Sequence, residues 1–119
     1  MPSPSDSCRL KVERAEDGAV VRLIGCALLD EESTPAVKDQ LTDLAEELGP
    51  AALRLDLHGV RLLSSTGLGM IVALHRQLKG QGGQLTLCGV TAPLHEIFEV
   101  TLLTRVLDIR RDEAHIGKH

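Results

Sequence analysis

Three consecutive hydroxyl side chains, Ser64, Ser65 and Thr66, stand where a strand-like alternating segment gives way to a helical pattern. Hydroxyls at the start of a helix can cap its free amides, attack a substrate as nucleophiles, or accept a phosphate. Which role applies decides whether the protein is an enzyme or a regulatory protein.

The residues around the hydroxyls do not fit a catalytic nucleophile. A nucleophile elbow needs Gly-x-Ser-x-Gly, and Ser65 has Leu63 two positions before it, although Gly67 does follow. A triad also needs a histidine oriented by an acid, and His75 and His95 fall within predicted helices with no aspartate placed to orient them. We therefore predict that the protein is not an enzyme and has no catalytic residue.

Signatures of cofactor and metal binding are also missing from the sequence. It contains no Gly-x4-Gly-Lys-Ser/Thr loop, and Gly67-x-Gly69 is too short for a dinucleotide fingerprint. Neither the five histidines nor the three cysteines have the spacing of metal ligands. We expect no cofactor and no metal.

Composition and hydropathy argue against nucleic acid and membrane as partners. The 119 residues, 43% apolar and 25% charged, predict one globular domain. Phe98 is the only aromatic residue and the net charge is -4, which disfavours base stacking and binding to a nucleic-acid backbone. Because we find no secretory signal and no apolar run near ~18 residues, we expect a cytoplasmic protein without membrane insertion. The sequence does not predict the oligomeric state.

The hydroxyl junction must be positioned by an α/β fold, a small mixed β-sheet flanked by helices. Period-two and helical apolar patterns predict the element order β-β-α-β-α-β-α-β. The predicted strands are 9–14, 19–24, 53–58, 84–88 and 106–109, and the predicted helices are 35–48, 66–79 and 92–100. We expect a flexible leader at 1–8, a single domain at 9–109 and a polar tail at 110–119.

Local reasoning leaves two roles for the hydroxyls. Capping occupies one of them, Ser64 or Ser65, and contributes about 1 kcal/mol. A phosphate on another would meet free amides and the positive end of the helix dipole, adding roughly -1.5 to -2 charges without disrupting the fold. Its effect would fall on whatever docks over that surface.

The chain resembles the STAS domain of bacterial anti-sigma factor antagonists. The resemblance is carried by the segments LRLDLHGV (53–60), LSSTGLG (63–69), GGQLTLCGV (82–90) and IFEV (97–100). It implies a small mixed sheet flanked by helices and a protein without catalytic activity. It also implies binding to an anti-sigma factor that is a serine kinase, phosphorylation of a hydroxyl by that kinase, and reversal by a phosphatase.

On this sequence the resemblance places the phosphate acceptor at Thr66, with Ser65 as the alternative. Where relatives carry an aspartate before the two hydroxyls, this chain carries Ser64. That departure keeps a second hypothesis open, in which the protein is an unphosphorylated STAS interaction subunit, either a signalling scaffold or part of a lipid-transport complex. In both cases the predicted partner-binding surface is the start of the helix: Ser64, Ser65, Thr66, Gly67, Leu68, Gly69 and Met70.

Overall fold

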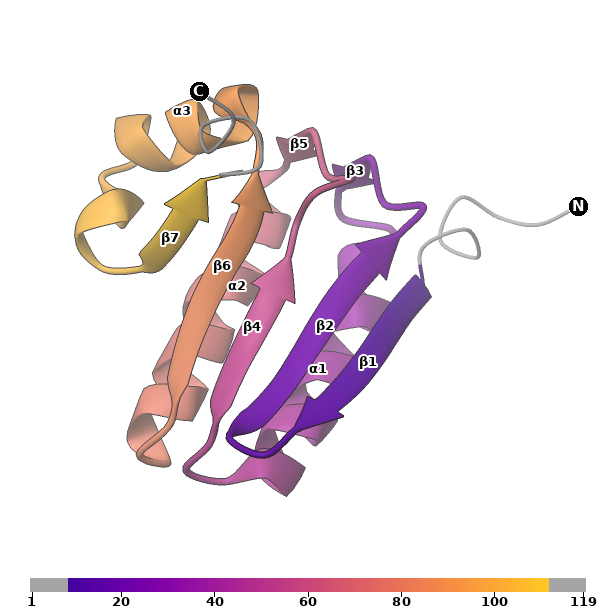
Figure 1. Cartoon of the computed structure of the whole chain (residues 1–119). Coiled ribbons are helices and arrows are strands. Elements are labelled where there is room, and N and C mark those ends of the chain that lie inside the picture. The colour runs from indigo at the N-terminus through magenta and orange to yellow at the C-terminus, as the bar shows by residue number, and fades with distance from the viewer. Residues whose placement is uncertain (1–8, 112–119) are drawn as a thin grey trace, which may run out of the picture.

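The computed structural model describes residues 9–111, which form a five-stranded sheet with two helices packed against one of its faces (Figure 1). The strand order is β1-β2-β4-β6-β7, with bounds β1 Arg9–Ala15, β2 Gly18–Ile24, β4 Ala52–Asp56, β6 Gln84–Val90 and β7 Asp108–Arg111. Strands β1 and β2 form an antiparallel hairpin, and the other neighbouring pairs are parallel. The predicted mixed α/β architecture is confirmed.

The main helices are α1 (Thr34–Leu48) and α2 (Ser65–Gly80), and both lie behind the sheet in Figure 1. Each turns a helically spaced apolar stripe toward the sheet, as the sequence predicts. The stripe of α1 includes Val37, Leu41 and Leu44, and that of α2 includes Ile71, Leu74 and Leu78. The alternating leucines of β4, Leu53 and Leu55, are fully buried beneath them. The third helix, α3 (Ala92–Val100), buries Leu94 and Phe98.

The two main helices are also joined by hydrogen bonds. Gln77 Nε2 donates to the Thr42 carbonyl at 3.2 Å, and Gln81 Nε2 donates to the Ala45 and Gly49 carbonyls at 2.8 and 3.0 Å. Gln77 of α2 and Gln81, which directly follows it, thus reach the C-terminal half of α1 and the residue that follows it, Gly49. The position of α2 against α1 is therefore fixed by polar contacts as well as by packing.

Two short parallel strands, β3 (Leu28–Leu29) and β5 (Leu62–Leu63), were not predicted from the sequence. Strands of two residues show no alternation, so periodicity cannot detect them.

The last strand also differs from the prediction. It covers Asp108–Arg111 rather than 106–109, because Leu103–Arg105 forms a 3₁₀ turn and Val106 follows it, 55% exposed. Arg110 and Arg111 thus belong to the sheet and not to the tail, while the expected leader at 1–8 and the rest of the tail lie outside the described residues.

Candidate functional site

The hydroxyl junction is held in place by β3, a segment more than thirty positions earlier in the chain. The amides of Arg61 and Leu62 both donate to the Ala27 carbonyl, at 2.8 and 3.2 Å, and the Ser64 amide donates to the Leu29 carbonyl at 2.8 Å. The parallel pairing of β3 with β5 continues this ladder. The start of α2 is therefore positioned by pairing with β3, immediately before the helix begins.

Ser64 caps α2. Its backbone is extended, with φ -75° and ψ 172°, and its Oγ accepts a hydrogen bond of 3.2 Å from the Gly67 amide. Its carbonyl accepts the first helical bond, from the Leu68 amide, at 2.9 Å. This geometry is that of an N-cap, which confirms capping and assigns it to Ser64 rather than Ser65.

Ser65 and Thr66 occupy the first two positions of α2, and both are exposed. Among the described residues, neither hydroxyl forms a hydrogen bond. The first turn contains no acidic residue. Two accessible hydroxyls therefore stand beside the positive end of a helix dipole, where added negative charge is stabilised.

The two glycines of the predicted surface have different surroundings. Gly67 is buried, and a Cβ there would lie 2.9 Å from the Leu29 carbonyl oxygen and 3.3 Å from Leu63 Cδ2. At Gly69 a Cβ would have no neighbour within 4 Å. Gly67 thus permits close packing of α2 on β3, whereas Gly69 leaves an open, exposed backbone.

A groove of about 510 Å³ separates the first turns of α1 and α2. It is lined by Thr34, Pro35, Lys38, Asp39, Thr66, Gly69 and Met70. Met70 is only 3% exposed, so it forms the floor of the groove and offers little area to a partner. Of the remaining predicted contacts, Ser64 and Leu68 are half-buried, while Ser65, Thr66 and Gly69 are exposed.

An apolar patch beside the junction was missed by sequence reasoning. Leu28 and Leu62 are register partners in the β3–β5 pair and are 47% and 55% exposed. Together they give the surface next to the start of α2 a small apolar area, of the kind that protein interfaces cover. The only signal is that each short strand is a Leu-Leu dipeptide, Leu28–Leu29 or Leu62–Leu63, whose first leucine is exposed and whose second is buried.

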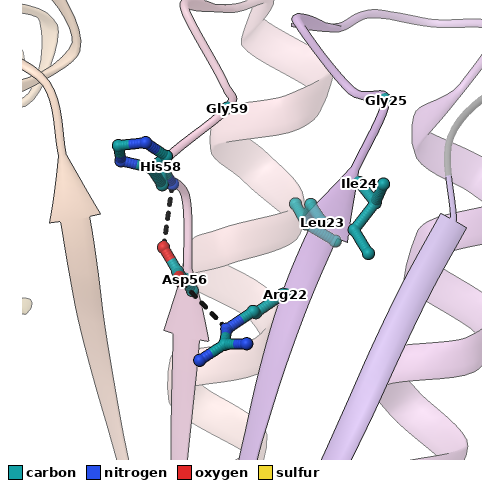
Figure 2. A pocket seen from close by; sticks show the side chains of 7 residues that line it. All are labelled: Arg22, Leu23, Ile24, Gly25, Asp56, His58 and Gly59. Carbon is teal, nitrogen blue, oxygen red and sulfur yellow. Dashed lines mark hydrogen bonds and ion pairs between the residues drawn. The ribbon is translucent and has the colours of Figure 1, made fainter.

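A second pocket, of about 470 Å³, opens at the carboxyl ends of β2 and β4 (Figure 2). Its polar groups are bonded to one another: Asp56 accepts from the His58 amide at 2.9 Å and pairs with Arg22 at 3.4 Å. Arg22 also pairs with Glu13 at 3.3 Å. These contacts join β1, β2 and β4 on the sheet face opposite α1 and α2, which is a structural role.

No described group activates the junction hydroxyls as nucleophiles. His75 Nδ1 is buried without a hydrogen-bond partner among the described residues. His95 Nδ1 lies 3.4 Å from a Glu99 carboxylate oxygen, but this pair lies within α3 and bonds to no hydroxyl of the junction. The described residues also include no cluster of His, Cys, Asp or Glu able to hold a metal, and none of their helices is long and apolar enough to cross a membrane.

Comparison with known proteins assigns the family. The model of the STAS domain matches residues 9–116. The chain belongs to the STAS domain family. The anti-sigma-B factor antagonist of Bacillus subtilis (strain 168) is 35% identical over 98 residues, covering 82% of this chain and 86% of that protein.

Solved STAS structures share the fold. An anti-sigma-factor antagonist (STAS) domain protein from Planctomyces limnophilus superposes with a TM-score of 0.79 at 18% identity, covering 90% of this chain and 93% of that one. The Bacillus cell fate determinant SpoIIAA in its phosphorylated form gives a TM-score of 0.65 at 16% identity, covering 92% and 98%. This STAS domain is therefore similar to anti-sigma factor antagonists, which are named as regulatory proteins rather than enzymes.

Proposed function

We propose that this STAS protein binds an anti-sigma factor of the serine-kinase type, and that the kinase controls the binding by phosphorylating Thr66. The observation that carries the proposal is an exposed, unbonded hydroxyl in the first turn of α2, within a chain 35% identical to an anti-sigma-B factor antagonist. A phosphatase would restore the binding form. The protein itself would perform no catalysis.

The docking surface combines the first turn of α2 with the apolar patch. Ser65, Thr66 and Gly69 supply exposed polar and backbone area. Leu62, two residues before the cap, and its register partner Leu28 supply apolar area. Apolar area at the centre of a contact with a polar rim is the usual composition of protein interfaces. The surface therefore suits a protein partner better than a small molecule.

Thr66 is the favoured acceptor because it lines the groove between α1 and α2, whereas Ser65 does not. Phosphorylation adds roughly -1.5 to -2 charges at neutral pH. At the start of α2 this charge is compatible with the helix, so the fold is retained and the effect falls on the partner. An opposing contribution of about 3 kcal/mol would weaken binding roughly a hundredfold, which is adequate for a switch.

Ser64 takes the place of the aspartate of relatives without loss of local structure. Serine and aspartate are nearly equivalent as N-caps, because both present an oxygen to the amides of the first turn. In this chain the bond from the Gly67 amide to Ser64 Oγ fulfils that function. The substitution thus leaves the presentation of Thr66 intact, which supports retention of the switch.

The proposal is tested by incubating the protein with its cognate kinase and ATP and mapping phosphate by mass spectrometry. We expect phosphate on Thr66, loss of most phosphorylation in Thr66→Val, and little change in Ser65→Ala. The modified protein should bind the kinase about a hundredfold more weakly, measured by calorimetry. Stable kinase binding with no phosphate on either residue would instead favour the unphosphorylated interaction subunit.

A further inference from the structure

We propose that the groove between the first turns of α1 and α2 is a receptor for the phosphate of phosphorylated Thr66, with the Lys38 ammonium as its ion-pair partner. This inference rests on the proposed function, because it concerns the phosphorylated chain. The ligand chemistry is that of a phosphate monoester dianion, and its source is the group attached to Thr66 itself.

The groove brings the two helices together at the right place. Thr66 lies in the first turn of α2, and Lys38 comes from the second turn of α1, on the other side of the groove. The hydrogen bonds from Gln77 and Gln81 to α1 hold the two helices together. A phosphate on Thr66 would therefore meet a preformed surface of α1.

Lys38 is available to that phosphate. It is exposed and forms no ion pair or hydrogen bond with the described residues. It also lines an adjoining hollow with Met70 and Leu74, which places its side chain along the seam between α1 and α2. A lysine that rests its alkyl chain on apolar neighbours keeps its ammonium at the surface, free to pair with an anion.

The other charged residue of the groove is Asp39, which opposes an anion. It does not line the adjoining hollow and so lies farther from the seam than Lys38 does. The residues that α2 contributes to the groove, Thr66, Gly69 and Met70, carry no charged side chain before phosphorylation. Asp30, in the turn before α1, has its carboxylate bonded to the Glu32 and Ser33 amides. The dipole of α2 adds to the attraction of Lys38.

Thr34 gives an independent indication that the groove takes an acceptor. It lines the groove and is 1% exposed, and its buried Oγ1 has no hydrogen-bond partner among the described residues. Native structures leave few buried hydroxyls unpaired. Threonine has two accessible χ1 rotamers in helices, so rotation about Cα–Cβ can redirect this hydroxyl to a phosphate oxygen. The phosphate would satisfy a donor that the unmodified protein leaves unpaired.

The test uses the full-length chain carrying phosphothreonine at position 66, installed by semisynthesis so that no kinase is required. Its second ionisation is followed by phosphorus NMR across a pH titration. A free phosphate monoester on a side chain has a second pKa of about 6, and a nearby cation lowers it. We expect a pKa lowered by at least about half a unit, most of which is lost in Lys38→Met.

Three further variants separate the contributions of Lys38, Asp39 and Thr34. Lys79→Met is the matched control, because Lys79 lies in the last turn of α2, roughly 20 Å from Thr66 at 1.5 Å per residue, and should not change the pKa. Asp39→Asn should lower the pKa further by removing a like charge. In the unmodified protein Thr34→Val removes an unpaired hydroxyl, so the melting temperature should stay the same or rise. In the phosphorylated protein the same substitution removes a hydrogen bond to the phosphate, so the melting temperature should fall below that of the phosphorylated parent.

Three results would overturn the proposal that the groove binds the phosphate of Thr66. The first is an ordinary pKa in the unsubstituted protein, and the second is a lowered pKa that Lys38→Met leaves unchanged. The third is saturable binding of inorganic phosphate to the unmodified chain, which would make the groove a site for free anions rather than for a tethered group. Because the phosphate is installed chemically, none of these results depends on kinase mapping, and failure of the kinase to modify Thr66 leaves this test intact.

Discussion

Replacing Gly67 by alanine should destabilise the protein, although alanine is the better helix former. The added Cβ would lie 2.9 Å from the Leu29 carbonyl oxygen and 3.2 Å from Leu29 Cβ, so α2 must move away from β3. Overpacking of this kind costs typically about 1–3 kcal/mol, and the gain in helix propensity offsets at most about 1 kcal/mol. We expect a net loss of about 1–2 kcal/mol.

Gly69→Ala is the matched control, two residues further along the same helix. Its Cβ meets nothing within 4 Å and the residue is exposed, so only the propensity term remains. This variant should be more stable than the parent by about 0.5–1 kcal/mol. The pair thus predicts opposite signs for the same substitution.

The assay is equilibrium unfolding in urea followed by circular dichroism, with free energies extrapolated to water. Gly67→Ala should lower the unfolding midpoint and Gly69→Ala should raise it, at unchanged slope. Gly67→Ala as stable as the parent would show that the Leu29–Gly67 approach does not constrain α2, and the assignment of that glycine to packing would be wrong.

Three other outcomes are expected. Ser64→Ala should lower the free energy of unfolding in urea by about 1 kcal/mol, because the Gly67 amide loses its acceptor. Ser65→Ala should change that free energy by less than about 0.5 kcal/mol. Equal effects of the two substitutions would contradict the assignment of Ser64 as the cap. Leu62→Ser should weaken kinase binding five- to tenfold, about 1 kcal/mol, without lowering the stability of the protein. Val100→Ser, at an exposed position on α3, should leave kinase binding unchanged. Equal losses of affinity in calorimetry would show that the Leu28–Leu62 patch is not a specific contact. Hydrogen bonding from the Ser33 amide lowers the pKa of the Asp30 carboxyl. The carboxylate therefore contributes stability above its unfolded-state pKa, and this contribution is lost as pH falls through its folded-state pKa. Asp30→Asn should make the urea midpoint fall less steeply with acidification, and an unchanged dependence of the midpoint on pH would contradict this role of Asp30.

Much of the fold could be predicted because the main elements have strong periodicity. The leucines of β4 alternate strictly, and the apolar residues of α1 and α2 recur at helical spacing, so tertiary packing and local pattern agree. The short strands β3 and β5 could not be predicted, because they exist only through pairing between distant segments.

The candidate site was predicted less completely, for the same physical reason. Sequence position identified Ser65 and Thr66 as hydroxyls at a helix start, but their exposure depends on Ser64 taking the cap. The difference between Gly67 and Gly69 depends on the approach of β3, which local pattern does not encode. Lys38 joins the site only through the packing of α1 against α2.

The β3–β5 pair also bears on when the proposed docking surface exists during folding. Leu28 and Leu62 are separated by helix α1 and strand β4 in the chain, so a growing polypeptide cannot assemble the surface until β5 has been made and has docked. Contacts of such sequence separation form late, because the loop between them must first be closed. A chain truncated before β5, or one in which β3 and β5 have not yet paired, would therefore not display the surface, and the partner would engage only molecules in which this pair has formed.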